Sequence, residues 1–192
     1  GIHTCQARPG NEHFSGPIHV DKKLLRVIVI DDSPDDAELV NEALRHAGHR
    51  VKTQRVQDIA GLNQALGKGA WDAVISEYDV PNLNVSAAQD TLRRAHLDIP
   101  FIVFTGRLSD EALTALMRDG VHDIVFKNQT ARLALALERE LHAALARHQC
   151  QAATQALREI EGKHQALMDG SLEAFCYSHD GMHTSTNAAY LA

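Results

Sequence analysis

The sequence has 192 residues, a formal net charge of −6 and a hydrophobic content of 44%, which are ordinary values for a globular protein. This acidic balance gives no electrostatic reason to expect nucleic acid as a partner. No apolar run reaches the roughly 20 residues that span a bilayer, so no membrane span is expected. The three cysteines, Cys5, Cys150 and Cys176, are far apart and form neither a disulfide framework nor a zinc motif, which favours a reducing, cytoplasmic setting.

Strand-like and helix-like segments alternate from residue 23 onward. Residues 1–22 show no hydrophobic periodicity, and we expect a flexible N-terminal arm there. The run LLRVIVI (24–30) predicts a buried strand, and Ser33 and Pro34 then open a helix. Further strands are expected at 51–56, 73–76, 101–105 and 121–126, and further helices at 58–66, 86–96 and 109–119. This alternation over residues 23–129 predicts an α/β domain with a five-stranded parallel sheet.

An extended fifth helix is predicted from Thr130 to Met168, because this segment has no proline and a single glycine. Apolar or small residues recur there at alternating spacings of three and four, as in a coiled coil: Ala143, Ala146, Cys150, Ala153, Leu157, Ile160 and Leu167, with His164 in the same series. We therefore expect a homodimer through residues 130–168. A single solvated helix, or a helix that folds back on its own domain, is the alternative.

The last segment, residues 169–192, changes pattern again. It predicts a strand at 172–178, a turn at Asp180-Gly181, a second strand at 182–186 and the start of a helix at Asn187. Two strands cannot close a hydrophobic core by themselves. We therefore expect the chain to end inside a second domain.

Charged and hydroxyl side chains follow four of the predicted strands. Asp31 and Asp32 end the first strand, Glu77 the third, Thr105 the fourth and Lys127 the fifth. The carboxyl ends of parallel strands meet at one edge of a sheet, where ligands collect. Carboxylates suit Mg²⁺, and a lysine with a hydroxyl group suits a phosphoryl oxygen. Each residue alone is more simply a solvated acid or an ion-pair partner, but the set predicts a phosphoryl-type site.

Four segments, VIVIDDSPDD, DAVISEYDVPN, PFIVFTG and DIVFKN, resemble those of the response-regulator receiver domain. The resemblance implies a flavodoxin-like (CheY-like) fold with strand order 2-1-3-4-5. It implies that Asp31 and Asp32 match the acidic pair that holds Mg²⁺ in this family. It also implies that Thr105 and Lys127 match the hydroxyl and ammonium groups that contact a phosphoryl group.

Three positions depart from the family's pattern. Glu77 stands at the position of the phosphoacceptor aspartate, because the family's proline follows four residues later and Pro81 has that spacing. The aromatic switch position holds Ile124, and Asn128 replaces the proline after the lysine. These departures imply a degenerate, non-enzymatic receiver used for docking, dimerisation or a fixed signalling state. A working phosphoacceptor at Glu77 or Asp79, in a two-component phosphorelay, is the alternative.

The pocket residues support three further expectations. Any Mg²⁺ held by Asp31, Asp32 and Glu77 should bind weakly, because the longer glutamate need not meet octahedral geometry. Lys127 should pair with one or more of these acids. A phosphatase of the haloacid type, with Asp31 as nucleophile, is disfavoured because the spacing to Glu77 and Lys127 fits the receiver pattern better.

The C-terminal segment ALMDGSLEAFCYSHDGMHTSTNAAY resembles the opening of a PAS domain. Receivers joined to PAS domains by a long helix occur in hybrid sensor proteins and in cyclic-di-GMP proteins, including FimX-like regulators of type IV pili. The resemblance implies a bacterial signalling protein whose partners are other signalling proteins. It assigns no PAS cofactor, and it leaves open whether the output domain, outside residues 1–192, is an enzyme.

Overall fold

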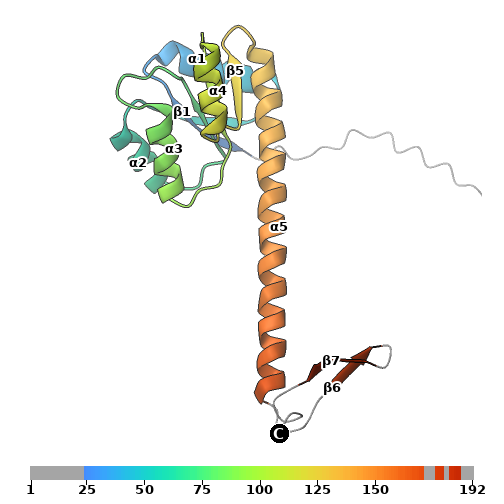
Figure 1. Ribbon diagram of the computed structural model, residues 1–192. Helices are drawn as coiled ribbons and strands as arrows, with labels where there is room; N and C mark the ends of the chain where they lie inside the picture. Colours follow the sequence, from blue (N-terminus) through green and yellow to red (C-terminus); the bar gives the residue numbers. More distant parts are fainter. Residues whose placement is uncertain (1–23, 171–175, 180–181, 187–192) are drawn as a thin grey trace, which may run out of the picture.

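The computed structural model describes residues 24–170, 176–179 and 182–186, and it shows an α/β domain from which one long helix extends (Figure 1). The strands of the domain are β1 (Leu25–Ile30), β2 (Val51–Val56), β3 (Ala73–Ser76), β4 (Phe101–Thr105) and β5 (Asp123–Phe126). Its helices are α1 (Pro34–His46), α2 (Ile59–Gly67), α3 (Val85–Arg94), α4 (Asp110–Arg118) and α5 (Thr130–Gly170). The predicted arm at residues 1–22 lies outside the described residues.

The five strands of the domain form one parallel sheet in the order β2-β1-β3-β4-β5. This order confirms the predicted flavodoxin-like topology. Ile30 at the end of β1 pairs with Ser76 at the end of β3, and Thr105 at the end of β4 pairs with Phe126 at the end of β5. The residues that follow these strand ends therefore lie along one edge of the sheet.

The sheet is buried on both faces, because side chains along a strand alternate between the two sides. In β1, Ile28 and Ile30 belong to the core beneath α2, α3 and α4, whereas Val27 and Val29 belong to the core beneath α1 and α5. All four side chains are essentially inaccessible to solvent. This double burial explains why the sequence of β1 is a continuous apolar run rather than an alternating one.

Polar side chains fix where the helices begin. Ser33 caps α1, and its Oγ accepts a hydrogen bond from the backbone N–H of Asp36. Asn84 caps α3 in the same way, and its Oδ1 accepts from Ala87. Because of this cap, α3 begins at Val85 rather than at residue 86, and it ends at Arg94, two residues earlier than predicted.

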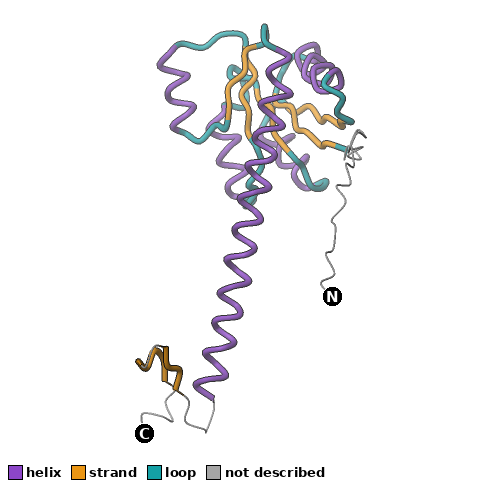
Figure 2. Tube along the Cα trace, turned by 90° about the vertical axis from the view of Figure 1, so that its right-hand side faces the viewer, coloured by secondary structure: helices purple, strands orange, loops and turns teal. Residues whose placement is uncertain are grey.

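The helix α5 continues far beyond the domain, as the two perpendicular views show (Figures 1 and 2). It runs from Thr130 to Gly170, slightly past the predicted end at Met168. After it, β6 (Cys176–His179) and β7 (Met182–Thr186) form an antiparallel pair. The second strand has the predicted bounds. The first part of the other predicted strand and the helix start at Asn187 lie outside the described residues.

Candidate functional site

The predicted cluster forms at the carboxyl edge of the sheet. Asp31 directly follows β1 and is 3% exposed, and Thr105 ends β4 and is equally buried. Asp32, the next residue, is exposed to solvent. Glu77 follows β3, and its backbone N–H donates to the carbonyl of Ile30, which holds it beside the end of β1. The site is therefore assembled by the register of the sheet.

The ammonium group of Lys127 lies among three carboxylates. Its Nζ is 2.5 Å from Glu77 Oε2, 2.7 Å from Asp36 Oδ2 and 3.7 Å from Asp31 Oδ2. The expectation that Lys127 pairs with acids of the pocket is confirmed. We call this group of four residues, Asp31, Asp36, Glu77 and Lys127, the lysine clamp.

Sequence reasoning did not identify Asp36 as a member of the site. From the sequence alone, Asp36 is simply an acid of the first turn of α1, where the helix dipole favours negative charge. The sequence signal is the second acidic pair in DDSPDD, four residues after the first. Through Asp36, the lysine clamp joins α1 to the ends of β3 and β5, which lie far apart in the sequence.

Both carboxylates nearest to the strand ends are also held by backbone groups. Glu77 Oε1 accepts a hydrogen bond from the backbone N–H of Tyr78 at 2.6 Å, so each of its two oxygens has a partner. Asp31 Oδ1 accepts from the backbone N–H of Ser33 at 2.8 Å. These contacts fix the orientation of the carboxylates toward Lys127.

Burial and charge shift two pKa values in the lysine clamp. Burial raises the pKa of Asp31 above its usual value, even though the Ser33 N–H and the Lys127 ammonium favour its charged form. Burial acts to lower the pKa of Lys127, but the hydrogen bonds to Asp36 and Glu77 outweigh it, and the pKa is raised. Lys127 therefore stays protonated at neutral pH.

The alternative acceptor and the switch position lie apart from this cluster. Asp79 is exposed and lines a groove between α3 and α4 rather than the pocket around Lys127. Ile124, at the expected aromatic position, is buried in β5 within the core beneath α4. The geometry thus places Glu77, not Asp79, against the lysine at the carboxyl edge of the sheet.

The acids do not present a ready cation site. Among the described residues, no group of three or more acidic, histidine or cysteine side chains is arranged to hold a metal ion. The ammonium of Lys127 lies between Asp31 and Glu77 instead, and Asp32 points to solvent. Mg²⁺ does not fit these side chains as they lie, because Lys127 would first have to release both carboxylates.

Comparison with known proteins identifies the domain. The response regulator receiver domain family matches residues 27–138. The C4-dicarboxylate transport transcriptional regulatory protein DctD of Pseudomonas aeruginosa is 28% identical, over 74% of this chain and 35% of its own length. Transcription factor SKN7 of Saccharomyces cerevisiae is 27% identical, over 55% of this chain and 17% of its length. The chain thus spans about a third or less of these relatives.

Solved structures show the same fold. NtrX from Brucella abortus superposes with a TM-score of 0.59 at 24% identity, over 67% of this chain and 29% of that structure. A DNA-binding response regulator of the LuxR family from Staphylococcus aureus superposes with a TM-score of 0.53 at 14% identity, over 61% of this chain and 98% of that structure. Within the described part of the chain, no helix is both long and apolar enough to cross a membrane.

Proposed function

The chain belongs to the response regulator receiver domain family of two-component signalling, and we propose that it is a degenerate receiver that signals without being phosphorylated. The observation that carries this proposal is the ion pair of Lys127 with Glu77 and Asp36. In active members of this family the matching lysine contacts the phosphoryl group that an aspartate at the acceptor position has taken up. Here the ammonium is already neutralised by two carboxylates.

The length of the glutamate side chain supports the same proposal. Glutamate is one methylene longer than aspartate, which moves its carboxylate roughly 1.5 Å further from the backbone. The extra length places Glu77 Oε2 directly against Lys127, in the space that a phosphoryl group on a shorter aspartate would occupy. The negative charge of Glu77 thus replaces part of the charge of a phosphoryl group and blocks its entry.

Intact mass after incubation with acetyl phosphate and Mg²⁺ tests the proposal. The wild type should gain no phosphoryl adduct, whereas Glu77→Asp should gain one, because the shorter carboxylate can attack phosphorus and release acetate. Glu77→Gln is the matched control and should stay unmodified. A wild-type adduct that is lost in Glu77→Gln would establish Glu77 as a working acceptor. An adduct lost instead in Asp79→Asn would assign the role to Asp79.

We propose further that the chain forms a parallel homodimer through residues 130–168. Beyond the domain, α5 exposes its larger apolar side chains: Leu157 is 56%, Ile160 64% and Leu167 75% accessible. Burying such a side chain fully contributes roughly 1.5–3 kcal/mol. An exposed apolar stripe of this regularity is typical of a helix that pairs with a second one.

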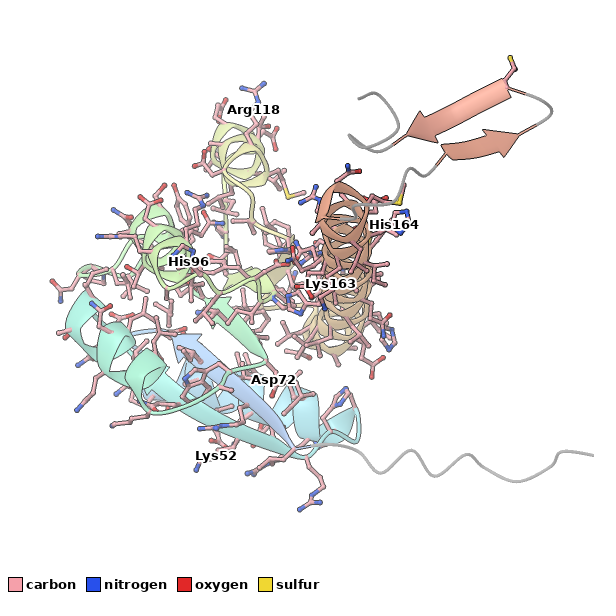
Figure 3. All side chains as sticks on the ribbon, turned by 90° about the horizontal axis from the view of Figure 1, so that it is seen from below. Lys52, Asp72, His96, Arg118, Lys163 and His164 are labelled. Atoms are coloured by element: carbon pink, nitrogen blue, oxygen red, sulfur yellow. The ribbon has the colours of Figure 1, made fainter. Side chains whose placement is uncertain are left out.

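The stripe faces away from the chain's own domain. At about 100° per residue, Ile160 lies roughly 180° around α5 from Leu133 and roughly 140° from Leu137. Both leucines are completely buried against the sheet. His164, in the same series as Ile160, lies on the side of α5 away from the domain (Figure 3). Around Ile160, beyond the domain, a second helix can therefore pair with α5 on this side.

Sedimentation of the wild type and of Ile160→Asp tests the dimer. The wild type should be dimeric at micromolar concentration, and the variant should dissociate because it places two carboxylates in the seam. Glu159→Asp, a conservative change at an exposed neighbouring position, is the matched control. A monomeric wild type would refute the homodimer and leave α5 as a spacer.

The pathway is also a proposal. We propose that α5 links this receiver to a PAS domain beginning near residue 169 in a cytoplasmic, FimX-like cyclic-di-GMP regulator that contacts other signalling proteins. The antiparallel strands β6 and β7 support this assignment, since they follow α5 directly. Loss of type IV pilus motility on deletion of the gene, restored by the intact gene, is the expected result. Unchanged motility, together with no binding of cyclic-di-GMP by the intact protein, would refute it.

A further inference from the structure

A groove runs along the amino edge of the sheet, which is the edge opposite to the lysine clamp. It lies between the starts of β1, β3 and β4 and the part of α5 that leaves the domain, and it has a volume of 660 Å³. Its walls are mostly apolar, with Leu25 from β1, Pro100 from the turn before β4, and Leu141, Ala144 and Leu145 from α5. We call this cavity the amino-edge groove.

Two leucines beside the amino-edge groove remain accessible to solvent. Leu145, on α5, is 55% exposed, and Leu24, which directly precedes the wall residue Leu25, is 43% exposed. A single exposed leucine needs no explanation. These two, however, flank a cavity with apolar walls, and such a surface is typical of a site that another segment covers.

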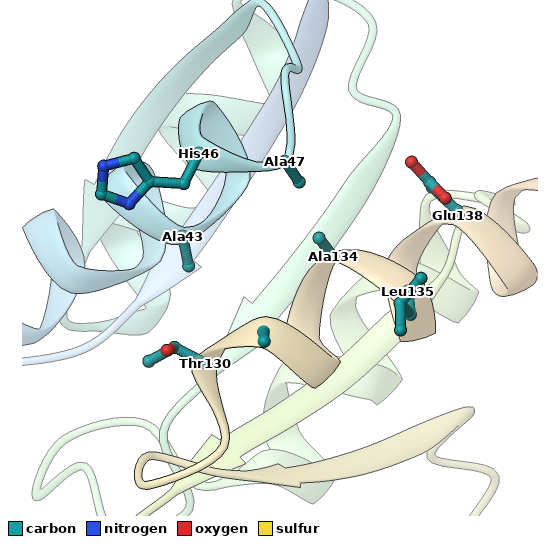
Figure 4. Close-up of a pocket in the computed structure, with 8 residues that line it drawn as sticks. Ala43, His46, Ala47, Thr130, Ala134, Leu135 and Glu138 are labelled. Carbon is teal, nitrogen blue, oxygen red and sulfur yellow. The ribbon is translucent and has the colours of Figure 1, made fainter.

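Ion pairs hold α5 in place over the amino-edge groove. Glu138 borders this groove and also the smaller cavity between α1 and α5, where Figure 4 shows it at one end. Its carboxylate pairs with His49, in the turn before β2, at 2.8 Å. Farther along α5, Arg147 pairs with Asp98, in the loop before β4, at 3.0 Å. The amino-edge groove is therefore preformed and does not depend on a movement of α5.

We infer that residues 14–23 of the same chain fold back over the amino edge of the sheet and cover this groove. Ile18 and Val20 then lie against Leu145. The segment joins the domain at the right place, because β1 begins at this edge and its first residue, Leu25, is itself a wall of the groove. The inference depends neither on the proposed homodimer nor on the state of the lysine clamp.

The segment is long enough to cross the groove. The strands β1, β3 and β4 are neighbours, and adjacent strands lie about 4.8 Å apart, so the start of β4 is about 10 Å from that of β1. An extended chain spans about 3.3–3.6 Å per residue, so Val20 can lie up to about 16–18 Å from Leu25. In such a chain Ile18 and Val20 project to the same side. The sequence predicts no regular helix or strand there, and none is needed to cover a groove.

Charge also favours this segment as the occupant. Within residues 14–23 the only acid is Asp21, and Lys22 and Lys23 follow it directly before the domain. Asp72, labelled in Figure 3, lies just before β3, next to the start of β1. Among the described residues that line the groove, none is lysine or arginine and three are acids, Asp72, Asp98 and Glu138. The groove therefore attracts a basic segment and repels an acidic one.

Thiol labelling of the whole chain tests the inference, in a background in which serine replaces Cys5, Cys150 and Cys176. Leu145→Cys should react with a maleimide roughly tenfold more slowly than Met117→Cys, because reaction requires the cover to open; Met117 is an exposed side chain on α4. Adding Val20→Asp should remove this protection of Leu145→Cys, whereas Val20→Ile should keep it. Ile2→Asp is the matched control, since it places the same charge far from the contact, and it should leave the protection unchanged.

The other outcomes each refute the inference. Equally fast labelling of Leu145→Cys and Met117→Cys would show that the groove is uncovered. Protection that survives Val20→Asp would exclude residues 14–23 as the cover, and its loss on dilution would assign the groove to a second copy of the chain. Protection that is lost both with Val20→Asp and on dilution would mean that the segment of one chain covers the groove of another.

Discussion

Lys127→Met removes the only cation of the lysine clamp and leaves its carboxylates facing one another. Removing one partner of a buried ion pair costs about 3–5 kcal/mol. The Lys127 side chain is 20% exposed and that of Asp36 33%, so solvent screens part of this loss. We expect the free energy of unfolding to fall by about 2–3 kcal/mol at pH 7, because three carboxylates then share one small space.

Urea denaturation followed by tryptophan fluorescence measures this change. Trp71, the single tryptophan, is buried and donates its indole N–H to the carbonyl of Ala65, so it reports on the receiver and not on the free part of α5. With a urea slope of about 1–3 kcal/mol/M, the midpoint should fall by about 0.7–3 M. Lys127→Arg keeps the charge and should retain most of the stability. Lys68→Met removes an exposed lysine and should change little.

The pH dependence distinguishes charge from packing. In Lys127→Met, Asp31 loses the cation that favours its charged form, so its raised folded-state pKa rises further, and the missing stability should return as the pH falls through that pKa. In the wild type the pKa of Lys127 is itself raised, so its contribution persists below the usual 10.5 and is lost as the pH rises further. Equal destabilisation in Lys127→Arg and Lys127→Met, independent of pH, would refute the electrostatic reasoning.

Two further predictions follow from the clamp and from the seam. Asp31→Asn should raise the melting temperature at pH 7 and have less effect at pH 4. Burial raises the pKa of Asp31, and the charge of this carboxylate destabilises the folded state only above that pKa. A melting temperature at pH 7 that is equal to or lower than that of the wild type would contradict this. Mild oxidation should link two chains by a disulfide between their exposed Cys150 side chains in a parallel dimer. The band of the linked dimer on non-reducing gels should be lost in Cys150→Ser and retained in Cys5→Ser. A dimer band that persists in Cys150→Ser would contradict the register of the two α5 helices.

The fold could be predicted from the sequence because its elements have strong local signals. The doubly buried β1, the caps at Ser33 and Ser109 and the alternation of strands and helices each follow from residue chemistry. Strand register then placed Glu77 and Lys127 together without further information. Asp36 could not be placed in the site, because its contact depends on the angle at which α1 leaves the sheet edge.

One short segment joins the lysine clamp to the helix of the proposed dimer. Lys127 directly follows β5 and begins the short loop to α5, which starts at Thr130. The guanidinium of Arg132, in the first turn of α5, donates to the carbonyl of Ile124 and to the carboxylate of Asp123, so this turn is held against β5 across the loop. Any displacement of Lys127 by a change at Glu77 therefore acts on the start of α5 directly. The position of the lysine clamp would then set the packing of α5, through which the proposed dimer forms. The coupling between the two would run through this short loop alone.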